Sequence, residues 1–291
     1  MKWLFVVMCF FLGCQTVRKS PITEAQPGVE ELKLAYAEKA KQAAALRNPF
    51  NGWIIWDDCD GMLWSGKYAT TACSVKIGAA EFEPGRFGRR PSPRCYDEVN
   101  GIDQGSKTTW SRDMAMGLFA YAWVCKKLDP LIRHRRYGIA NNWIMGQPIA
   151  DGRTVYTPQV IGLMHEIIYK LGGENSPNRA LPSVYPEGLV NYKAHLQMIN
   201  IWLRGELMGE ISRVMHKRIK EHSEREPYNP FYQYMAGLYE GNQTRAIKLL
   251  LDPSMPMGSY VRCKHEHRCK LADWLFTARL VLESVKPAPA Q

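Results

Sequence analysis

The sequence predicts an all-α protein. Apolar residues recur at spacings of three and four along most of the chain, as in Met114, Leu118, Tyr121 and Cys125, which is the pattern of helices with one buried face. The two-residue alternation that is typical of half-buried strands is nearly absent. Turns that contain proline or glycine, such as "LGGENSPN" (171–178), separate the helical stretches. Successive helical hairpins in one domain of this size indicate an (α/α) toroid, or an incomplete barrel of helical hairpins.

The amino terminus has the composition of an export signal. Lys2 precedes an apolar run, Leu4–Gly13, which is too short for a permanent membrane helix. Residues 1–13 are therefore interpreted as a signal peptide. The end of this run, "FLGC", resembles the lipobox of bacterial lipoproteins, and that resemblance implies cleavage before Cys14 and a lipid anchor on its sulfur. The alternative is an ordinary signal peptide with a chance cysteine.

A single helical domain is expected after a polar tether. The tether covers residues 14–28, the domain covers 29–286, and residues 287–291 form a short flexible tail. The first helix follows Gly28, has acids early and bases late, and ends at Asn48. A second helix is predicted over 61–73, after Asp60.

Residues 76–108 are rich in glycine, proline and arginine, and they predict a long irregular loop. The next helix is capped by Ser111 and is stopped by Pro130. The pattern then predicts helices over 130–145, 157–171, 191–223, 229–239, 242–251 and 268–284.

The cysteines and the charge both suit an exported protein. With Cys14 assigned to lipid, six cysteines remain after the signal peptide, and an oxidising compartment favours disulfides. Cys263 and Cys269 are expected to close the small loop "CKHEHRC", with zinc as the alternative because two histidines lie between them. The pairing of the other four stays open; they are Cys59, Cys73, Cys95 and Cys125.

The formal net charge of +10 indicates anionic partners. For an exported protein these are envelope polymers and lipid headgroups, and no nucleic-acid partner is expected. The location expected from the signal is the cell envelope, either the periplasm or the outer membrane, as a lipoprotein.

The stretch "WIIWDDCDGMLW" (53–64) allows three interpretations. Asp58 or Asp60 could cap a helix by accepting backbone N–H bonds. The stretch also resembles the first motif of haloacid dehalogenase-like phosphatases, which would make Asp58 the nucleophile and would require a parallel sheet. The third interpretation pairs Asp60 with Asp113 of "TTWSRDMAMG" (108–117), as two carboxylates at helix starts.

Three motifs carry a resemblance to the six-hairpin glycosidases, the (α/α) toroids. They are "DCDGMLWSGKYA", "GRFGRRPSPRC" and "SRDMAMGLFAYAW". The resemblance implies a substrate site at one end of the toroid, with Asp60 as general acid and Asp113 as general base, or with these roles exchanged. Substrate contacts are expected from seven further residues: Trp56, Asp58, Trp64, Arg90, Trp110, Arg112 and His165. For His165 the competing interpretation is a core histidine, and the tryptophans could equally fill the core.

The function predicted from these observations is hydrolysis of an envelope polysaccharide by two carboxylates, with no metal or cofactor. The first alternative is a lipoprotein that binds a glycan or a protein without catalysis. The second alternative is the phosphatase that uses the Asp58-Cys59-Asp60-Gly61 motif.

Overall fold

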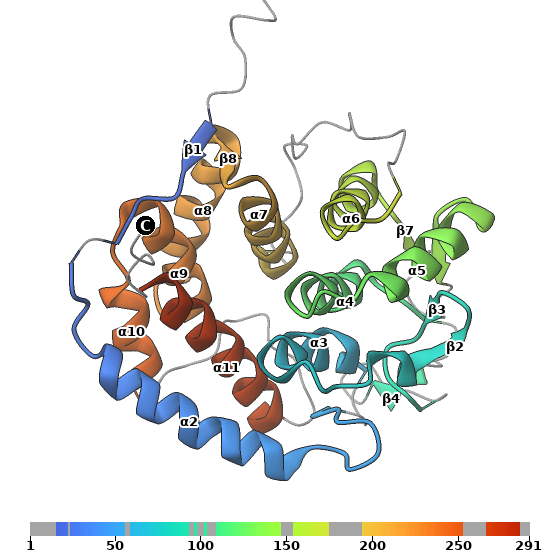
Figure 1. Cartoon of the computed structure of the whole chain (residues 1–291), viewed down its shortest axis with the longest axis horizontal. Helices are drawn as coiled ribbons and strands as arrows, with labels where there is room; N and C mark the ends of the chain where they lie inside the picture. The colour runs from blue at the N-terminus through green and yellow to red at the C-terminus, as the bar shows by residue number, and fades with distance from the viewer. Residues whose placement is uncertain are drawn as a thin grey trace, which may run out of the picture.

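The computed structural model describes residues 16–22, 24–55, 59–92, 96–97, 102–103, 109–146, 154–174, 194–252 and 266–285. This part of the chain is mostly helical, as predicted, and contains ten α-helices. They are α2 (Val29–Leu46), α3 (Gly61–Ala72), α4 (Arg112–Val124), α5 (Leu128–Ala140), α6 (Pro158–Lys170), α7 (Ala194–Met208), α8 (Arg213–Arg225), α9 (Pro230–Glu240), α10 (Thr244–Leu251) and α11 (Glu266–Ser284) (Figure 1). None of the described helices is both long enough and apolar enough to cross a membrane.

The strands of the described segments form four separate antiparallel pairs, each of two strands. They are β1 (Thr16–Arg18) with β8 (Glu210–Ser212), β2 (Glu81–Glu83) with β3 (Arg86–Phe87), β4 (Tyr96–Asp97) with β5 (Ile102–Asp103), and β6 (Ile144–Gly146) with β7 (Thr154–Val155). A 3-10 helix, η1 (Ile77–Ala80), precedes β2. The predicted loop over 76–108 therefore contains short hairpins where the structure describes it.

Six helices form a closed series of contacts. α3 packs on α4, α4 on α6, α6 on α7, α7 on α9, α9 on α11, and α11 again on α3 (Figure 1). α4 also contacts α7 directly. The remaining helices lie outside this series: α2 against α10 and α11, α5 against α4 and α6, and α8 against α7 and α9. The outer helix α2 buries only Leu32 and Ala43, whereas α9 is buried along almost its whole length.

The closest helix pair is α3 with α4, which touch backbone to backbone. A Cβ atom on Gly66 would lie 2.5 Å from the carbonyl carbon of Gly117, and one on Gly117 would lie 2.4 Å from the carbonyl oxygen of Met62. A disulfide joins Cys73 and Cys125, which cap the carboxyl ends of the two helices, with a Cα–Cα distance of 5.4 Å. The helices therefore run in the same direction, and both amino termini lie at the same end.

Disulfides also involve Cys59 and Cys269. The predicted partner of Cys269, Cys263, lies outside the described residues. The Cys73–Cys125 disulfide is compatible with the oxidising, extracellular location predicted from the sequence.

A buried ion pair connects α3 to α11. The Nζ atom of Lys67 contacts a carboxylate oxygen of Asp273, and the two side chains are 1% and 7% exposed. Three aromatic rings surround the ammonium group, with centroids 5.0 Å (Trp64), 5.3 Å (Phe276) and 5.6 Å (Phe231) from Nζ. A buried charge needs such compensation, because desolvation of an unpaired ammonium costs several kcal/mol.

Two helix boundaries differ from the prediction. The single helix expected over 191–223 is two helices, α7 and α8, because Gly209 adopts a left-handed conformation (φ +74°) and β8 follows it. Pro130 does not stop the preceding helix. It lies in the first turn of α5, where a missing N–H donor costs no hydrogen bond.

The segment predicted to be a tether is bound to the body from Thr16 onward. β1 pairs with β8, and the backbone N–H of Ser20 donates to the carbonyl oxygen of Leu238 at 2.9 Å. The side-chain oxygen of Gln26 accepts a hydrogen bond of 2.8 Å from the backbone N–H of Gln243, at the start of α10. Residues 16–22 and 24–28 are therefore part of the folded unit.

The close α3–α4 contact leads to a stability prediction. Gly66→Ala would place a methyl group inside the backbone of α4, so we expect a loss of about 2 kcal/mol or more in the free energy of unfolding. Chemical denaturation measures this loss. Gly78→Ala is the matched control, because its Cβ would have only one neighbour, at 3.9 Å. Equal stability of the two variants would contradict the close contact.

Candidate functional site

Arg89 links the two carboxylates that the sequence predicts to be catalytic. Its Nη1 atom lies 3.2 Å from Oδ1 of Asp60, and its charge also acts on Asp113. The guanidinium is 7% exposed, whereas the side chains of Asp60 and Asp113 are 30% and 28% exposed. At the amino-terminal end of α3 and α4, the buried cation therefore pairs with Asp60 and acts on Asp113 through its charge. We call Asp60, Arg89, Asp113 and His195 the Arg89 cluster.

Asp60 is held by the loop that carries Arg89. It occupies the N-cap position of α3, but its side chain makes no capping hydrogen bond. The loop contributes at two points: the backbone N–H of Met62 donates to the carbonyl oxygen of Arg89 at 2.6 Å, and Arg89 Nη1 donates to the carbonyl oxygen of Cys59 at 3.3 Å. Asp60 thus lies at the N-cap position, as the helix-cap interpretation predicts. Its carboxylate, however, binds Arg89 and does not cap the helix.

His195 brings a third helix start to the cluster. It lies in the first turn of α7, and its Nε2 atom is 3.7 Å from Oδ2 of Asp113. Burial alone raises the pKa of Asp113, but His195 and Arg89 lower it by a larger amount. The pKa of Asp113 is therefore well below its usual value, and this carboxylate is ionised at neutral pH. Its position in the first turn of α4 acts in the same direction, through the helix dipole.

A buried hydrogen-bond chain supports the start of α4. The indole N–H of Trp110 donates to the hydroxyl of Tyr156 at 2.7 Å, and this hydroxyl lies 2.7 Å from Nε2 of His134. Nδ1 of His134 lies 2.8 Å from the carbonyl oxygen of Gly85, which can only accept, so Nδ1 carries the proton and Tyr156 donates to Nε2. Thr154 adds a 2.6 Å hydrogen bond to the carbonyl oxygen of Trp110. Trp110, which precedes Ser111, is thus held through both its side chain and its backbone carbonyl.

The other predicted contact residues are placed differently. Trp64 and Trp110 are buried in the core, at 1% and 0% exposure, so neither ring presents a face to a ligand in this structure. His165 is buried on α6 with its ring 5.8 Å from that of Trp143, as the core-histidine interpretation has it. Arg90 and Arg112 are half-buried, in the loop after Arg89 and at the start of α4. The remaining predicted site residues, Trp56, Asp58 and the lipidation site Cys14, lie outside the described residues.

Arg89 and His195 are not among the catalytic and substrate-contact residues predicted from the sequence. Both carry a local signal: Arg89 belongs to the basic run "RFGRR", and His195 follows "NYKA" at the start of a predicted helix. Neither stretch of sequence indicates which acid its side chain contacts. Asp60 and Arg89, for example, come together only because of the path of the loop between α3 and α4.

The described residues contain no group of three or more His, Cys, Asp or Glu side chains arranged to hold a metal ion. In the Arg89 cluster, Asp60 pairs with a guanidinium and Asp113 lies beside an imidazole, whereas a hard divalent metal prefers a set of oxygen ligands.

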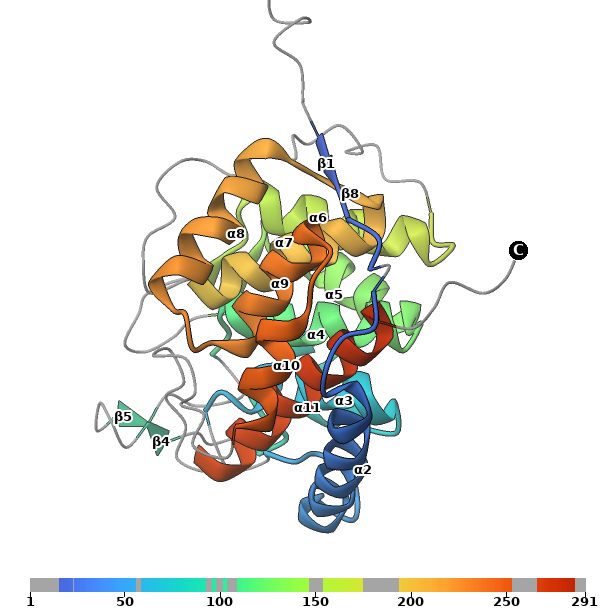
Figure 2. The same cartoon turned by 90° about the vertical axis from the view of Figure 1, so that its left-hand side faces the viewer.

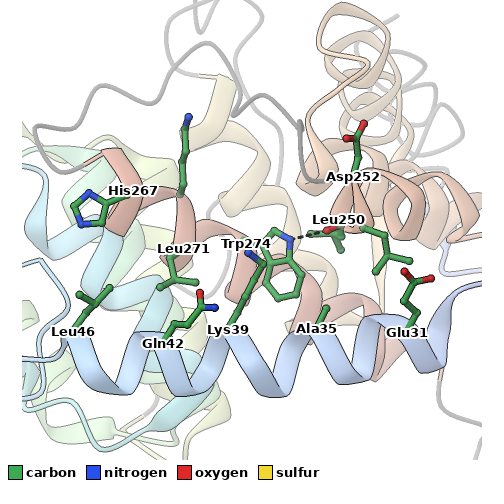
Figure 3. Close-up of a pocket in the computed structure, with 12 residues that line it drawn as sticks. Glu31, Ala35, Lys39, Gln42, Leu46, Leu250, Asp252, His267, Leu271 and Trp274 are labelled. Atoms are coloured by element: carbon green, nitrogen blue, oxygen red, sulfur yellow. Dashed lines mark hydrogen bonds between the residues drawn. The ribbon is translucent and has the colours of Figure 1, made fainter.

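A separate groove of about 550 Å³ lies between α2, α10 and α11. Figure 3 shows Trp274 on its floor, where the indole N–H donates to the carbonyl oxygen of Leu250 at 2.9 Å. The ammonium group of Lys39 lies 5.1 Å from the centroid of the Trp274 ring. This groove is formed by a different set of helices from those that begin at the Arg89 cluster.

No protein-family model, curated protein sequence or solved structure matches this chain.

The charge balance of the cluster predicts the effect of removing Arg89. In Arg89→Met the pKa of Asp113 should rise toward its ordinary value of about 3.9, because the positive charge of Arg89, which lowers this pKa, is lost. A pH titration followed by carbon-13 NMR of aspartate carboxyl groups measures this shift. Arg86→Met is the control, because Arg86 pairs instead with Glu83 at 2.9 Å. An unchanged titration of Asp113 in Arg89→Met would contradict the proposed coupling.

Because His134 is buried, we expect the protein to lose stability in acid. Burial lowers its pKa from 6.5 to about 4. Between these values the unfolded chain binds a proton that the folded chain does not, so stability is highest above pH 6.5 and falls as the pH drops. We expect denaturation curves at pH 7 and pH 4.5 to differ less in His134→Gln than in the wild type, by up to about 3 kcal/mol. Equal pH dependence in the two proteins would show that His134 does not carry this effect.

Proposed function

We propose that this protein is an exported glycoside hydrolase-like enzyme that uses Asp60 and Asp113 as its two catalytic carboxylates. The observation that carries the proposal is the Arg89 cluster, in which Asp60 pairs with a buried guanidinium whose charge also acts on Asp113. Two carboxylates that flank a glycosidic bond are the usual machinery of glycoside hydrolysis.

The electrostatics favour one assignment of roles. Asp113 is kept ionised by His195 and Arg89, so it suits the general base that takes a proton from the attacking water. Asp60 then donates a proton to the leaving oxygen. A protonated Asp60 has to give up its ion pair with Arg89, so substrate binding must draw the guanidinium away from this carboxylate. The released guanidinium can then bind a substrate hydroxyl or carboxylate.

The proposed (α/α) toroid, complete or partly open, is supported by the helix contacts. The series α3, α4, α6, α7, α9 and α11 closes on itself, and α2, α5, α8 and α10 lie outside it. Asp60, Asp113 and His195 each lie at the amino-terminal end of a helix of this inner series. In six-hairpin glycosidases, which this chain resembles, carboxylates at helix starts perform the reaction.

The proposed location is the cell envelope, with a lipid anchor on Cys14. The apolar run before this cysteine and the Cys73–Cys125 disulfide support export. An envelope polysaccharide is the proposed substrate class, because it is the polymer that an anchored and basic protein meets there.

The non-catalytic alternative, a glycan- or protein-binding lipoprotein, would use the same cluster as a polar binding site. The phosphatase alternative has less support, since it requires a parallel sheet and the described strands form only antiparallel pairs.

The decisive test is hydrolysis. We expect the wild type to release reducing ends from at least one member of a panel of envelope polysaccharides, and Asp60→Asn and Asp113→Asn each to lower the rate by about a hundredfold or more. Asp129→Asn is the matched control, because Asp129 is an exposed acid in the first turn of α5. Full activity in both Asp60→Asn and Asp113→Asn would contradict the proposal. Glycan binding without cleavage by the wild type would favour the non-catalytic alternative.

A further inference from the structure

Exposed apolar and basic side chains lie around the junction of β1, β8 and the neighbouring parts of α7 and α8. Met208 and Val214 are 58% and 42% exposed, which is unusual for side chains of this size. The exposed side chains of Arg18 (85%) and Lys217 (79%) lie on the adjoining β1 and α8. We call this surface the β1–α8 face; its residues are Arg18, Met208, Arg213, Val214, Lys217 and Lys220.

The charge of this face is positive. Between residues 208 and 220 the chain has four lysines or arginines and a single acid, Glu210. Glu210 lies 3.4 Å from Arg18, with its side chain 33% exposed. The next acid along α8, Glu221, lies 2.5 Å from Arg218 and 3.9 Å from Lys217, so it offsets one of these two charges. The excess of positive charge is therefore carried by Arg213, Lys220 and one charge of the Lys217–Arg218 pair.

The β1–α8 face adjoins the point where the amino-terminal segment joins the body. β1 contacts both β8 and α8, and in both views it lies at the end of the molecule opposite α2 (Figures 1 and 2). Only one residue separates Cys14 from Thr16, the first residue of β1. Two residue steps span at most about 7 Å. A membrane anchor at or before Cys14 would therefore hold this face next to the bilayer.

We infer that the β1–α8 face rests on the anionic surface of the bilayer to which the amino terminus is attached. The lysines and arginines lie among the headgroups, and Met208 and Val214 enter the boundary between headgroups and acyl chains. The anchor then holds the face at the bilayer surface, and the basic and apolar side chains of the face add their own contributions to membrane binding. This inference rests on the proposed amino-terminal anchor, but not on the catalytic proposal.

Site-specific photocrosslinking of the full chain tests the inference. A photoreactive amino acid replaces Met208 in one variant and Leu34, an exposed residue of α2 (75%), in another. The vesicles contain phosphatidylcholine with about 30% phosphatidylglycerol, or phosphatidylcholine alone. We expect lipid adducts at position 208 at least several-fold more often than at position 34, and fewer adducts on the neutral vesicles.

Two charge-reversal double variants distinguish an effect of the β1–α8 face on membrane contact from an effect of the net charge of the protein. Arg213→Glu with Lys217→Glu should lower the adducts at position 208 about tenfold. Lys33→Glu with Lys41→Glu, which changes the net charge equally on exposed positions of α2, should leave them unchanged. Equal adducts at positions 208 and 34, equal effects of the two double variants, or crosslinks from position 208 to protein instead of lipid would each overturn the inference. Circular dichroism confirms that each variant is folded.

Discussion

The backbone contact between α3 and α4 is the constraint on which the candidate site depends. With glycine on both sides of the crossing, at Gly66 and Gly117, the two helix axes approach more closely than side chains would allow. The Cys73–Cys125 disulfide joins the same helices at their carboxyl ends. Because the pair is parallel and fixed at two points, the opposite ends must also lie together, and those ends carry the two candidate carboxylates.

The interior around this pair uses polar contacts that admit few alternative arrangements. The Lys67 ammonium group has its carboxylate partner and three aromatic faces, and the chain from Trp110 through Tyr156 to His134 ends on a backbone carbonyl. Such groups are costly to bury unless their geometry is satisfied, so they favour one packing over others of similar apolar area. The lysine fixes α3 against α11, and the histidine chain fixes the residues before α4.

In the Arg89 cluster, the same few side chains hold segments of the protein together and include the proposed reactive groups. Arg89 joins a loop to the start of α3 through its backbone carbonyl and its guanidinium, and the guanidinium also faces the acids. His195 comes from a distant segment and lowers the pKa of Asp113. A carboxylate that stays ionised is free to accept a proton, whereas an acid that must hold a proton needs the nearby guanidinium to move. The proposed exchange of Arg89 between Asp60 and substrate follows from this asymmetry.

Local pattern by itself determined the all-α class and most helix positions, because a buried helical face requires apolar residues at spacings of three and four. It failed at Gly209, where Leu203, Leu207, Ile211 and Val214 continue the helical spacing across a left-handed turn that only tertiary pairing with β1 explains. Local pattern also singled out Asp60 and Asp113 as acids at helix starts. Only the tertiary structure decided that Arg89 and His195 adjoin these acids and that Trp64 and Trp110 lie in the core. These are contacts between segments far apart in the sequence, and periodicity records only that a face is buried, not which segment covers it.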